Sequence, residues 1–178
     1  FDRNGNLTGS SENEPIALSL ILGQKLYAVL QKLFYKNTLD KVVYSCAIAI
    51  RRSILEDVKG FDENFDFLEA DNDFCMAVHE KGWKIVVDSE IKAFHEGGGS
   101  PQVVSERVLR FYKNRYYLLK KYNRIKYLTL FKFIVLLRLR LELYYLKFFG
   151  KIIFQNPNVL KDKILGRTKI INYCKNSY

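Results

Sequence analysis

Apolar residues recur every three or four positions in the longest patterned stretches of the chain. This spacing predicts amphipathic helices over 17–36, 101–122 and 128–154. The third stretch is the most apolar, but charged side chains interrupt it at Lys132, Arg138, Arg140, Glu142 and Lys147. No uncharged run approaches the roughly 20 residues that a membrane-spanning helix needs. Two interpretations of 128–154 stay open: a helix that lies in a membrane interface, and a helix that packs on its own domain.

Shorter elements are predicted between the first two of these helices. The apolar run 42–50, with β-branched and aromatic members, is typical of a buried strand. A short helix should follow, with Ser53 as its N-cap and Gly60 at its end. The segment 73–81 predicts another helix, which ends before Gly82.

The remaining segments have weaker patterns. Residues 84–87 and 91–94 predict two short strands, and His95 comes at the exit of the second. Asn4-Gly5 predicts a hairpin turn, because both residues tolerate positive φ. Residues 9–15 are polar and typical of a loop, and a basic, weakly patterned tail follows the third long helix.

The formal net charge of +10 is divided unevenly along the 178 residues. Residues 1–98 contain 11 basic and 16 acidic side chains, a net charge of −5, whereas residues 99–178 have a net charge of +15. The split suggests a mildly acidic catalytic or packing half and a cationic half that faces an anionic partner. The three cysteines lack metal-ligand spacing, which favours reduced thiols in a cytosolic setting.

Candidate chemistry is concentrated in residues 60–100. Glu69, Asp71 and Asp73 lie at the start of a predicted helix, and His95 follows the second predicted strand. A carboxylate at the start of a helix and an imidazole at the end of a strand can converge in one pocket. Such a pair suits proton abstraction beside a metal-bound, negatively charged substrate. The simpler alternative is that the acids cap the helix and interact with its dipole.

Several short motifs in and around this region follow one another in a fixed order. They are Ala47-Ile48-Ala49-Ile50-Arg51-Arg52-Ser53, Gly60-Phe61-Asp62-Glu63-Asn64-Phe65, Glu69-Ala70-Asp71-Asn72-Asp73-Phe74-Cys75, Gly82-Trp83-Lys84-Ile85, Phe94-His95, Gly98-Gly99-Ser100 and Lys113-Asn114-Arg115-Tyr116. Together they resemble the C-terminal half of family-2 glycosyltransferases, closest to the rhamnosyltransferase-like and galactofuranosyltransferase-like branch. Each motif is weak alone, but their order and spacing over residues 42–122 make the resemblance specific.

The resemblance implies an α/β fold: the C-terminal portion of a GT-A, Rossmann-like domain, followed by amphipathic C-terminal helices. Residues 1–122 would form the acceptor-side part of that domain, and 123–178 a basic helical extension that could associate with a membrane. In this family the Asp-x-Asp metal motif and the nucleotide pocket lie earlier in the sequence. We therefore expect the nucleotide-binding half to be absent from this chain, and the chain alone to be inactive.

The implied activity is inverting transfer of a sugar from a nucleotide-diphosphate sugar to a glycan or lipid-linked acceptor, in cell-surface polysaccharide synthesis. Asp71 matches the family's general base, which takes the proton from the acceptor hydroxyl. His95 matches the histidine that joins the divalent metal, Mn or Mg, on the donor diphosphate. The first acid of the motif is replaced by Ala70, and Glu69, one position earlier, could support Asp71.

Other residues fit the same chemistry. The run Gly97, Gly98 and Gly99 lets backbone amides approach phosphate oxygens closely, and Arg51 could contact the diphosphate. The cationic, aromatic C-terminal half would hold the enzyme against an anionic membrane surface. The expected location is therefore cytoplasmic, with peripheral attachment to the inner face of the cell membrane.

Two alternatives from other classes stay open. Basic residues interleaved with tyrosine and phenylalanine also suit phosphate backbones, which would make the chain a nucleic-acid-binding module. The basic surplus, however, lies in long apolar helices and no recognised nucleic-acid motif is present, so no nucleic-acid partner is expected. The second alternative is a catalytically inactive accessory module.

Overall fold

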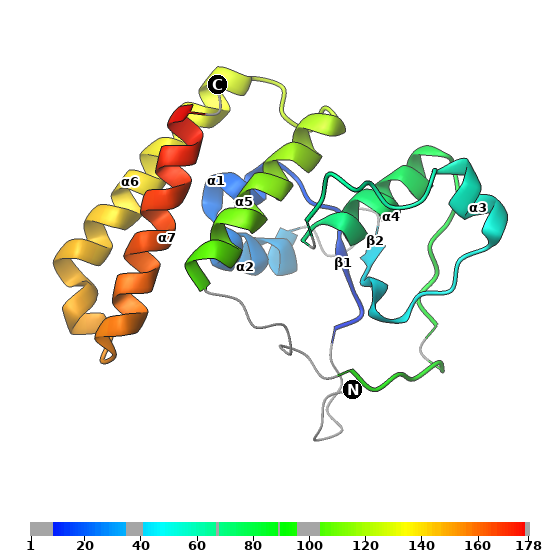
Figure 1. Ribbon diagram of the computed structural model, residues 1–178, viewed down its shortest axis with the longest axis horizontal. Helices are drawn as coiled ribbons and strands as arrows, with labels where there is room; N and C mark the ends of the chain where they lie inside the picture. Colours follow the sequence, from blue (N-terminus) through cyan, green and yellow to red (C-terminus); the bar gives the residue numbers. More distant parts are fainter. Residues whose placement is uncertain (1–8, 35–40, 67, 89, 96–103, 177–178) are drawn as a thin grey trace. The chain divides into compact units, whose positions relative to one another are not determined.

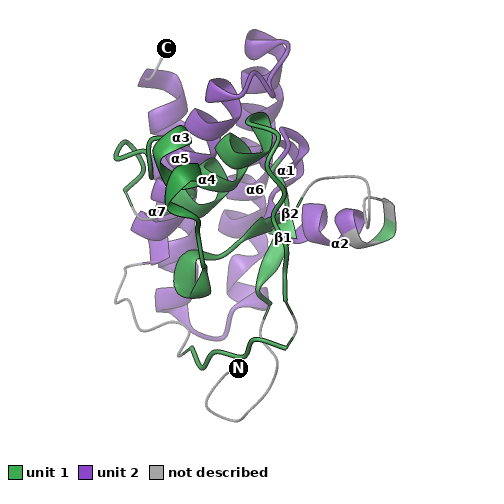
Figure 2. Cartoon of the chain, turned by 90° about the vertical axis from the view of Figure 1, so that its right-hand side faces the viewer, with its two compact units in different colours: residues 1–15, 33–101 green, residues 16–32, 102–178 purple. Residues whose placement is uncertain are grey.

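The computed structural model describes most of the chain (Figure 1), namely residues 9–34, 41–66, 68–88, 90–95 and 104–176. These residues are mostly helical and contain one small two-stranded sheet. The chain divides into two compact units (Figure 2). Unit 1 comprises residues 1–15 and 33–101, and unit 2 comprises residues 16–32 and 102–178.

The sheet of unit 1 is an antiparallel pair of strands, β1 (Ser11–Asn13) and β2 (Lys41–Val43). The strand predicted over 42–50 is therefore wrong beyond Val43. A strand extends only as far as its partner, and β1 is short. The chain after β2 instead forms a single turn of 3-10 helix, η1 (Ser45–Ala47), whose side chains are exposed.

Two helices of unit 1 lie near their predicted positions, α3 (Arg52–Asp57) and α4 (Ala70–Glu80). Ser53 is not the N-cap of α3, because Arg51 holds that position with an extended backbone and without a side-chain capping bond. The helix predicted from residue 73 begins earlier, at Ala70. Its first turn is closed by a hydrogen bond of 2.9 Å from the N–H of Asp73 to the carbonyl of Glu69.

The two strands predicted at 84–87 and 91–94 are wrong, since both segments have irregular backbone. Their apolar side chains are not buried: Val86 is 82% exposed and Ile91 is 75% exposed. Within the described residues β1 and β2 pair only with each other, so neither segment joins this sheet. The hairpin predicted at Asn4-Gly5 lies outside the described residues.

The core of unit 1 lies between α4 and the sheet. Val42 of β2 is fully buried, and Phe74 and Met76 of α4 are almost fully buried. The ring of Phe61 stacks on Phe74, with 4.6 Å between the ring centroids. The helix therefore covers one face of a sheet too small to be stable alone.

Unit 2 is helical. It contains α1 (Leu18–Leu22), most of α2 (Gln24–Phe34), α5 (Val104–Lys121), α6 (Leu128–Ile153) and α7 (Pro157–Asn176). Helices α5 and α6 confirm the two predictions made for these regions, although residues 101–103 lie outside the described ones. The helix predicted over 17–36 is divided into α1 and α2 by Gly23, whose φ is +79°.

Helices α1, α5, α6 and α7 share one hydrophobic core. It is made of Leu20, Tyr112, Tyr116, Leu119, Phe131, Val135, Leu139, Ile170, Ile171 and Cys174. Helix α5 therefore belongs to the same unit as the later helices. In the sequence, that unit resumes at residue 102, whereas the expected division was after residue 122. Its tyrosines and leucines are buried against α7, so the chain after residue 122 is not a separate extension.

Candidate functional site

A buried amide near the start of α4 joins two carboxylates of unit 1. The Nδ2 atom of Asn72 donates to Oε2 of Glu69 at 3.0 Å and to Oε1 of Glu12 at 3.3 Å. Glu69 precedes the helix and Glu12 belongs to β1, so this one side chain links a loop, a helix and a strand. Because a buried carboxylate is costly unless it is hydrogen-bonded, these contacts help to keep Glu69 in the interior.

A second contact between α4 and the end of β1 lies two helical turns further on. Nδ1 of His79 is 2.7 Å from Oε1 of Glu14, which directly follows β1 and is buried. Helix positions seven apart lie on one face, and so do strand positions two apart. The pairs Asn72–Glu12 and His79–Glu14 therefore fix α4 along the strand at two points.

A cysteine completes the contact between α4 and the sheet. Sγ of Cys75 accepts a hydrogen bond of 3.4 Å from the N–H of Val43. Burial raises the pKa of the Cys75 thiol above its ordinary value of 9.0, so the group is neutral at neutral pH. All three cysteines are free thiols, as predicted, and Cys46 is the exposed one.

Asp71 differs from the other acids of the cluster in its accessibility. It lies in the first turn of α4 and is half-buried, whereas the next acid of the helix, Asp73, is 3% exposed. Its carboxylate makes no hydrogen bond or ion pair within the part of the chain that the structure describes. A general base must reach the proton that it removes. The geometry therefore favours Asp71 over Asp73 for that role.

Glu69 has an uncommon backbone conformation just before Asp71. Its φ of +73° and ψ of −5° lie in the left-handed region, which non-glycine residues seldom occupy. Such a conformation costs about 1–3 kcal/mol and tends to occur at functional sites. Since the Glu69 carboxylate is buried and bonded to Asn72, it is suited to hold the loop in front of Asp71 rather than to act as a base.

Two other predicted site residues, His95 and Arg51, lie on other segments of the described chain. His95 is exposed at the end of the segment 90–95, and Arg51 is exposed at the start of α3. Neither side chain forms a hydrogen bond or an ion pair with Asp71 there. The glycines expected to bind diphosphate, Gly97, Gly98 and Gly99, lie outside the described residues.

The fit of a divalent metal can be tested on the donors that are described. Among these residues, no three His, Cys, Asp or Glu side chains are grouped closely enough to hold an ion. His95 could contribute one ligand at most. The described residues therefore do not by themselves fit the expected Mn or Mg centre.

Glu12, Glu14, Asn72 and His79 were not predicted from the sequence as parts of the site. The alternation Glu12-x-Glu14 was the available signal, because it places two acids on one face of an extended segment. Asn72 is 60 positions from Glu12, and His79 is 65 positions from Glu14. At such separations the pairing cannot be predicted from the sequence pattern alone.

Comparisons of the chain with models of known families, with curated proteins and with solved structures find no match. Support for a function therefore comes from the order of the sequence motifs and from the geometry around α4.

Proposed function

We propose that this chain is the acceptor-side part of an inverting glycosyltransferase that moves a sugar from a nucleotide-diphosphate sugar to a glycan or lipid-linked acceptor. The observation that carries the proposal is the position of Asp71. The motif order assigns it the role of base, and in the fold it is the accessible acid at the start of α4, without a hydrogen bond or ion pair in the described residues.

The chemistry requires a group of this kind. An alcohol is a weak nucleophile, and a positioned carboxylate that accepts its proton contributes about 10²–10⁴-fold to the rate. Asp71 would take that proton as the acceptor oxygen attacks the sugar carbon, while the bond from that carbon to the diphosphate oxygen breaks and the nucleoside diphosphate leaves with the electron pair. Asn72 and Glu69 would keep the turn before Asp71 in place through their hydrogen bond of 3.0 Å. A divalent ion would take His95 as one ligand and would stabilise, as a Lewis acid, the negative charge on the departing diphosphate.

The outer face of α6 supports a membrane-attached location. We define this face by apolar side chains that are exposed and lie opposite the buried positions of the helix: Leu130, Phe133, Leu137, Leu141, Tyr144, Phe148 and Ile152. Exposed Arg140, Lys147 and Lys151 lie along it. Apolar side chains beside cations suit an anionic bilayer surface. None of the helices in the described ranges combines the length and apolar character required to cross a bilayer.

The two faces of α6 therefore support different interpretations of the helix. The outer face fits a helix that lies in a membrane interface, and the inner face fits a helix that packs on its own domain. Phe131, Val135 and Leu139 are buried in the core of unit 2, which fits a helix packed on its own domain. The outer face does not take part in this core and is therefore available to bind another surface. In the proposal, that surface is the inner leaflet of the cell membrane, where a lipid-linked acceptor would be reached from the cytoplasm.

The test is a transfer assay on the chain together with whatever coding sequence lies upstream of Phe1, using labelled nucleotide-diphosphate sugars and membrane acceptors. Asp71→Asn should reduce transfer by at least about 100-fold, because the base is lost, while donor binding stays intact. Glu80→Gln, an exposed acid at the other end of α4, is the matched control and should leave transfer unchanged.

Near-normal transfer by Asp71→Asn would remove Asp71 as the base. His95→Ala should weaken metal-dependent donor binding, and unchanged metal dependence would exclude that role for His95. No transfer by the unaltered protein with any donor would favour a catalytically inactive accessory module.

A further inference from the structure

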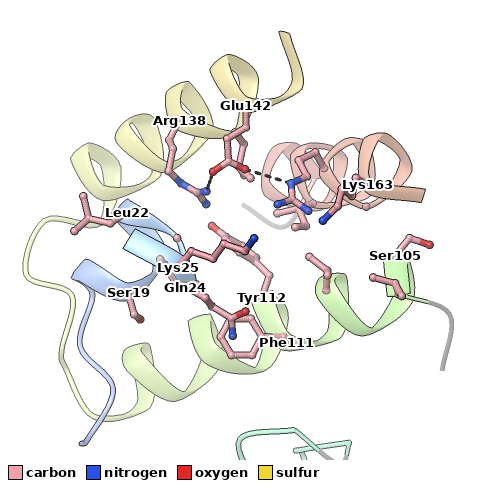
Figure 3. A pocket seen from close by; sticks show the side chains of 18 of the residues that line it. Ser19, Leu22, Gln24, Lys25, Ser105, Phe111, Tyr112, Arg138, Glu142 and Lys163 are labelled. Atoms are coloured by element: carbon pink, nitrogen blue, oxygen red, sulfur yellow. Dashed lines mark hydrogen bonds and ion pairs between the residues drawn. The ribbon is translucent and has the colours of Figure 1, made fainter. Parts of the chain in front are cut away.

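Unit 2 contains a cavity of about 450 Å³ that the proposed transfer does not use (Figure 3). Residues of α1, α2, α5, α6 and α7 line it. Its apolar wall includes Leu20, Phe111, Tyr112, Leu139 and Ile170. Small-molecule sites typically have volumes of about 300–1,000 Å³ and are often formed between the helices of a bundle. The cavity is therefore large enough for a ligand with an apolar part.

The charged side chains around the cavity are mostly cationic. Lys25 of α2, Arg138 of α6, and Lys163 and Arg167 of α7 line it, against only Glu142 and Asp162. Figure 3 shows Lys25, Arg138 and Lys163 approaching the space from three different helices. Cations that converge from separate elements favour an anion in the space between them.

The acids do not cancel this excess. Glu142 is already bonded to Arg138, and its other oxygen accepts from Nε of Arg167 at 3.2 Å. Asp162 accepts from the backbone N–H of Ser105 at 3.3 Å. The lining thus has four cations and two anions, a net charge of +2.

Arg138 also carries an unused donor. Its Nε atom is buried and has no hydrogen-bond partner among the described residues, although its Nη1 atom is bonded to Glu142. A buried donor without an acceptor is destabilising. A guanidinium suits phosphate oxygens in particular, because its N–H groups form a planar fork. The first turn of α2, which also lines the cavity, adds to the positive potential as a helix N-terminus.

We propose that this cavity binds an organic phosphate with an apolar body, whose phosphate lies among Lys25, Arg138 and Lys163 and whose apolar part contacts Phe111, Leu139 and Ile170. The volume fits a head group with a short apolar chain rather than inorganic phosphate alone. The same chemistry occurs in lipid headgroups and in soluble phosphate esters. This site goes beyond the proposed transfer, because its formation does not involve Asp71.

The test measures binding of hexyl phosphate, inorganic phosphate and hexanol to the full chain by calorimetry. Hexyl phosphate should bind at least about tenfold more tightly than either of the others, because only it meets both the cations and the apolar wall. Lys25→Ala and Lys163→Ala should each weaken it by about tenfold, the low end for a charged hydrogen bond. Lys161→Ala, an exposed lysine of α7 outside the lining, is the control and should bind normally.

Two competitors identify the source of the phosphate. Displacement of hexyl phosphate by vesicles that contain phosphatidic acid assigns a lipid headgroup, whereas displacement by phenyl phosphate assigns a soluble ester. The proposal is overturned if neither displaces it, if hexyl phosphate binds no better than inorganic phosphate, or if both lysine variants bind like the unaltered chain. These results do not depend on sugar transfer, so failure of one proposal leaves the other standing.

Discussion

Nδ1 of His79 lies 2.7 Å from Oε1 of Glu14, although the two residues are 65 positions apart in sequence. Both side chains are largely buried, at 17% and 5% exposure. The contact ties the second half of α4 to the end of β1, just as Asn72 ties its first turn to Glu12. The position of Asp71 on the molecule therefore depends on contacts that the proposed reaction does not itself involve.

A double-mutant cycle on this pair should show strong coupling. Glu14→Leu and His79→Leu should each lower the free energy of unfolding by about 1–3 kcal/mol, because each leaves a buried polar partner unsatisfied. Together they should cost clearly less than the sum of the two, with a coupling of at least about 0.5 kcal/mol. Urea unfolding of the four proteins measures this. Glu80→Gln is the exposed control, and strict additivity would show that the contact contributes nothing.

Gly23→Ala should destabilise unit 2. The φ of +79° and ψ of +156° at this position lie in a region that is essentially restricted to glycine, so alanine should cost about 1–3 kcal/mol. An added Cβ would also come within 3.1 Å of Nη1 of Arg138. Urea unfolding provides the measurement. The control is Gly9→Ala, where no atom lies within 4 Å of the added Cβ, and equal stability of the two variants would contradict the prediction.

The three thiols should differ in reactivity. Burial raises the pKa of both Cys75 and Cys174, and only the thiolate is an efficient nucleophile. At pH 8, iodoacetamide should therefore modify exposed Cys46 first, and the other two only after denaturation. Mass spectrometry of digested samples identifies the modified residue. Equal labelling of all three in the folded chain would show that α4 and α7 do not protect their cysteines.

The same burial predicts how stability depends on pH. The folded-state pKa of Cys75 is raised above its ordinary value of 9.0, so the folded chain retains a proton that the unfolded chain loses. The free energy of unfolding should be unaffected by this group below about pH 9 and should fall as the pH rises above that value. Urea titrations between pH 8 and 10 measure the decline, which should be smaller in Cys75→Ala. The same slope in both proteins would exclude the thiol as its cause.

The outer face of α6 should bind anionic vesicles. Leu141→Asp and Phe148→Asp together should weaken flotation with phosphatidylserine vesicles by more than about tenfold. Each of these exposed apolar side chains would contribute about 1.5–3 kcal/mol to the free energy of membrane binding when fully inserted. Both positions are exposed, so the fold should be retained. Leu165→Asp, on an exposed position of α7, is the control. Salt-sensitive binding to RNA without vesicle binding would favour the nucleic-acid alternative instead.

The elements that could be predicted from the sequence are those in which the buried apolar residues repeat at regular helical spacing. In α5 and α6 the apolar positions repeat at helical spacing and face a core, so their existence and most of their extent followed from the pattern. Helix α7 was harder to predict, because its buried residues are few, namely Gly166, Ile170, Ile171 and Cys174, and basic residues separate its apolar positions. It forms because α5 and α6 are both there to pack against it.

Strands were harder to predict than helices, because a strand depends on a partner that lies elsewhere. The run 42–50 has suitable residues, but β1 pairs with only its first positions. For the site, the acids before an amphipathic segment predicted Asp71 near the start of a helix, but that helix begins at Ala70 rather than at residue 73 and so includes Asp71. The residues that hold this helix in place, Glu12 and Glu14, come from a segment whose polar composition indicated only a loop.

The two units are interleaved along the chain, since residues 16–32 of unit 2 are inserted between the segments of unit 1. The polypeptide therefore passes from one unit to the other three times. A cut after residue 101 would yield a C-terminal piece without α1, whose Leu20 belongs to the core shared with α5 and α6. The N-terminal piece would keep α1, and its Leu20 would have lost the helices that bury it. Neither unit can thus be produced intact by a single cut, and a swap of either with another protein would have to preserve all three passages.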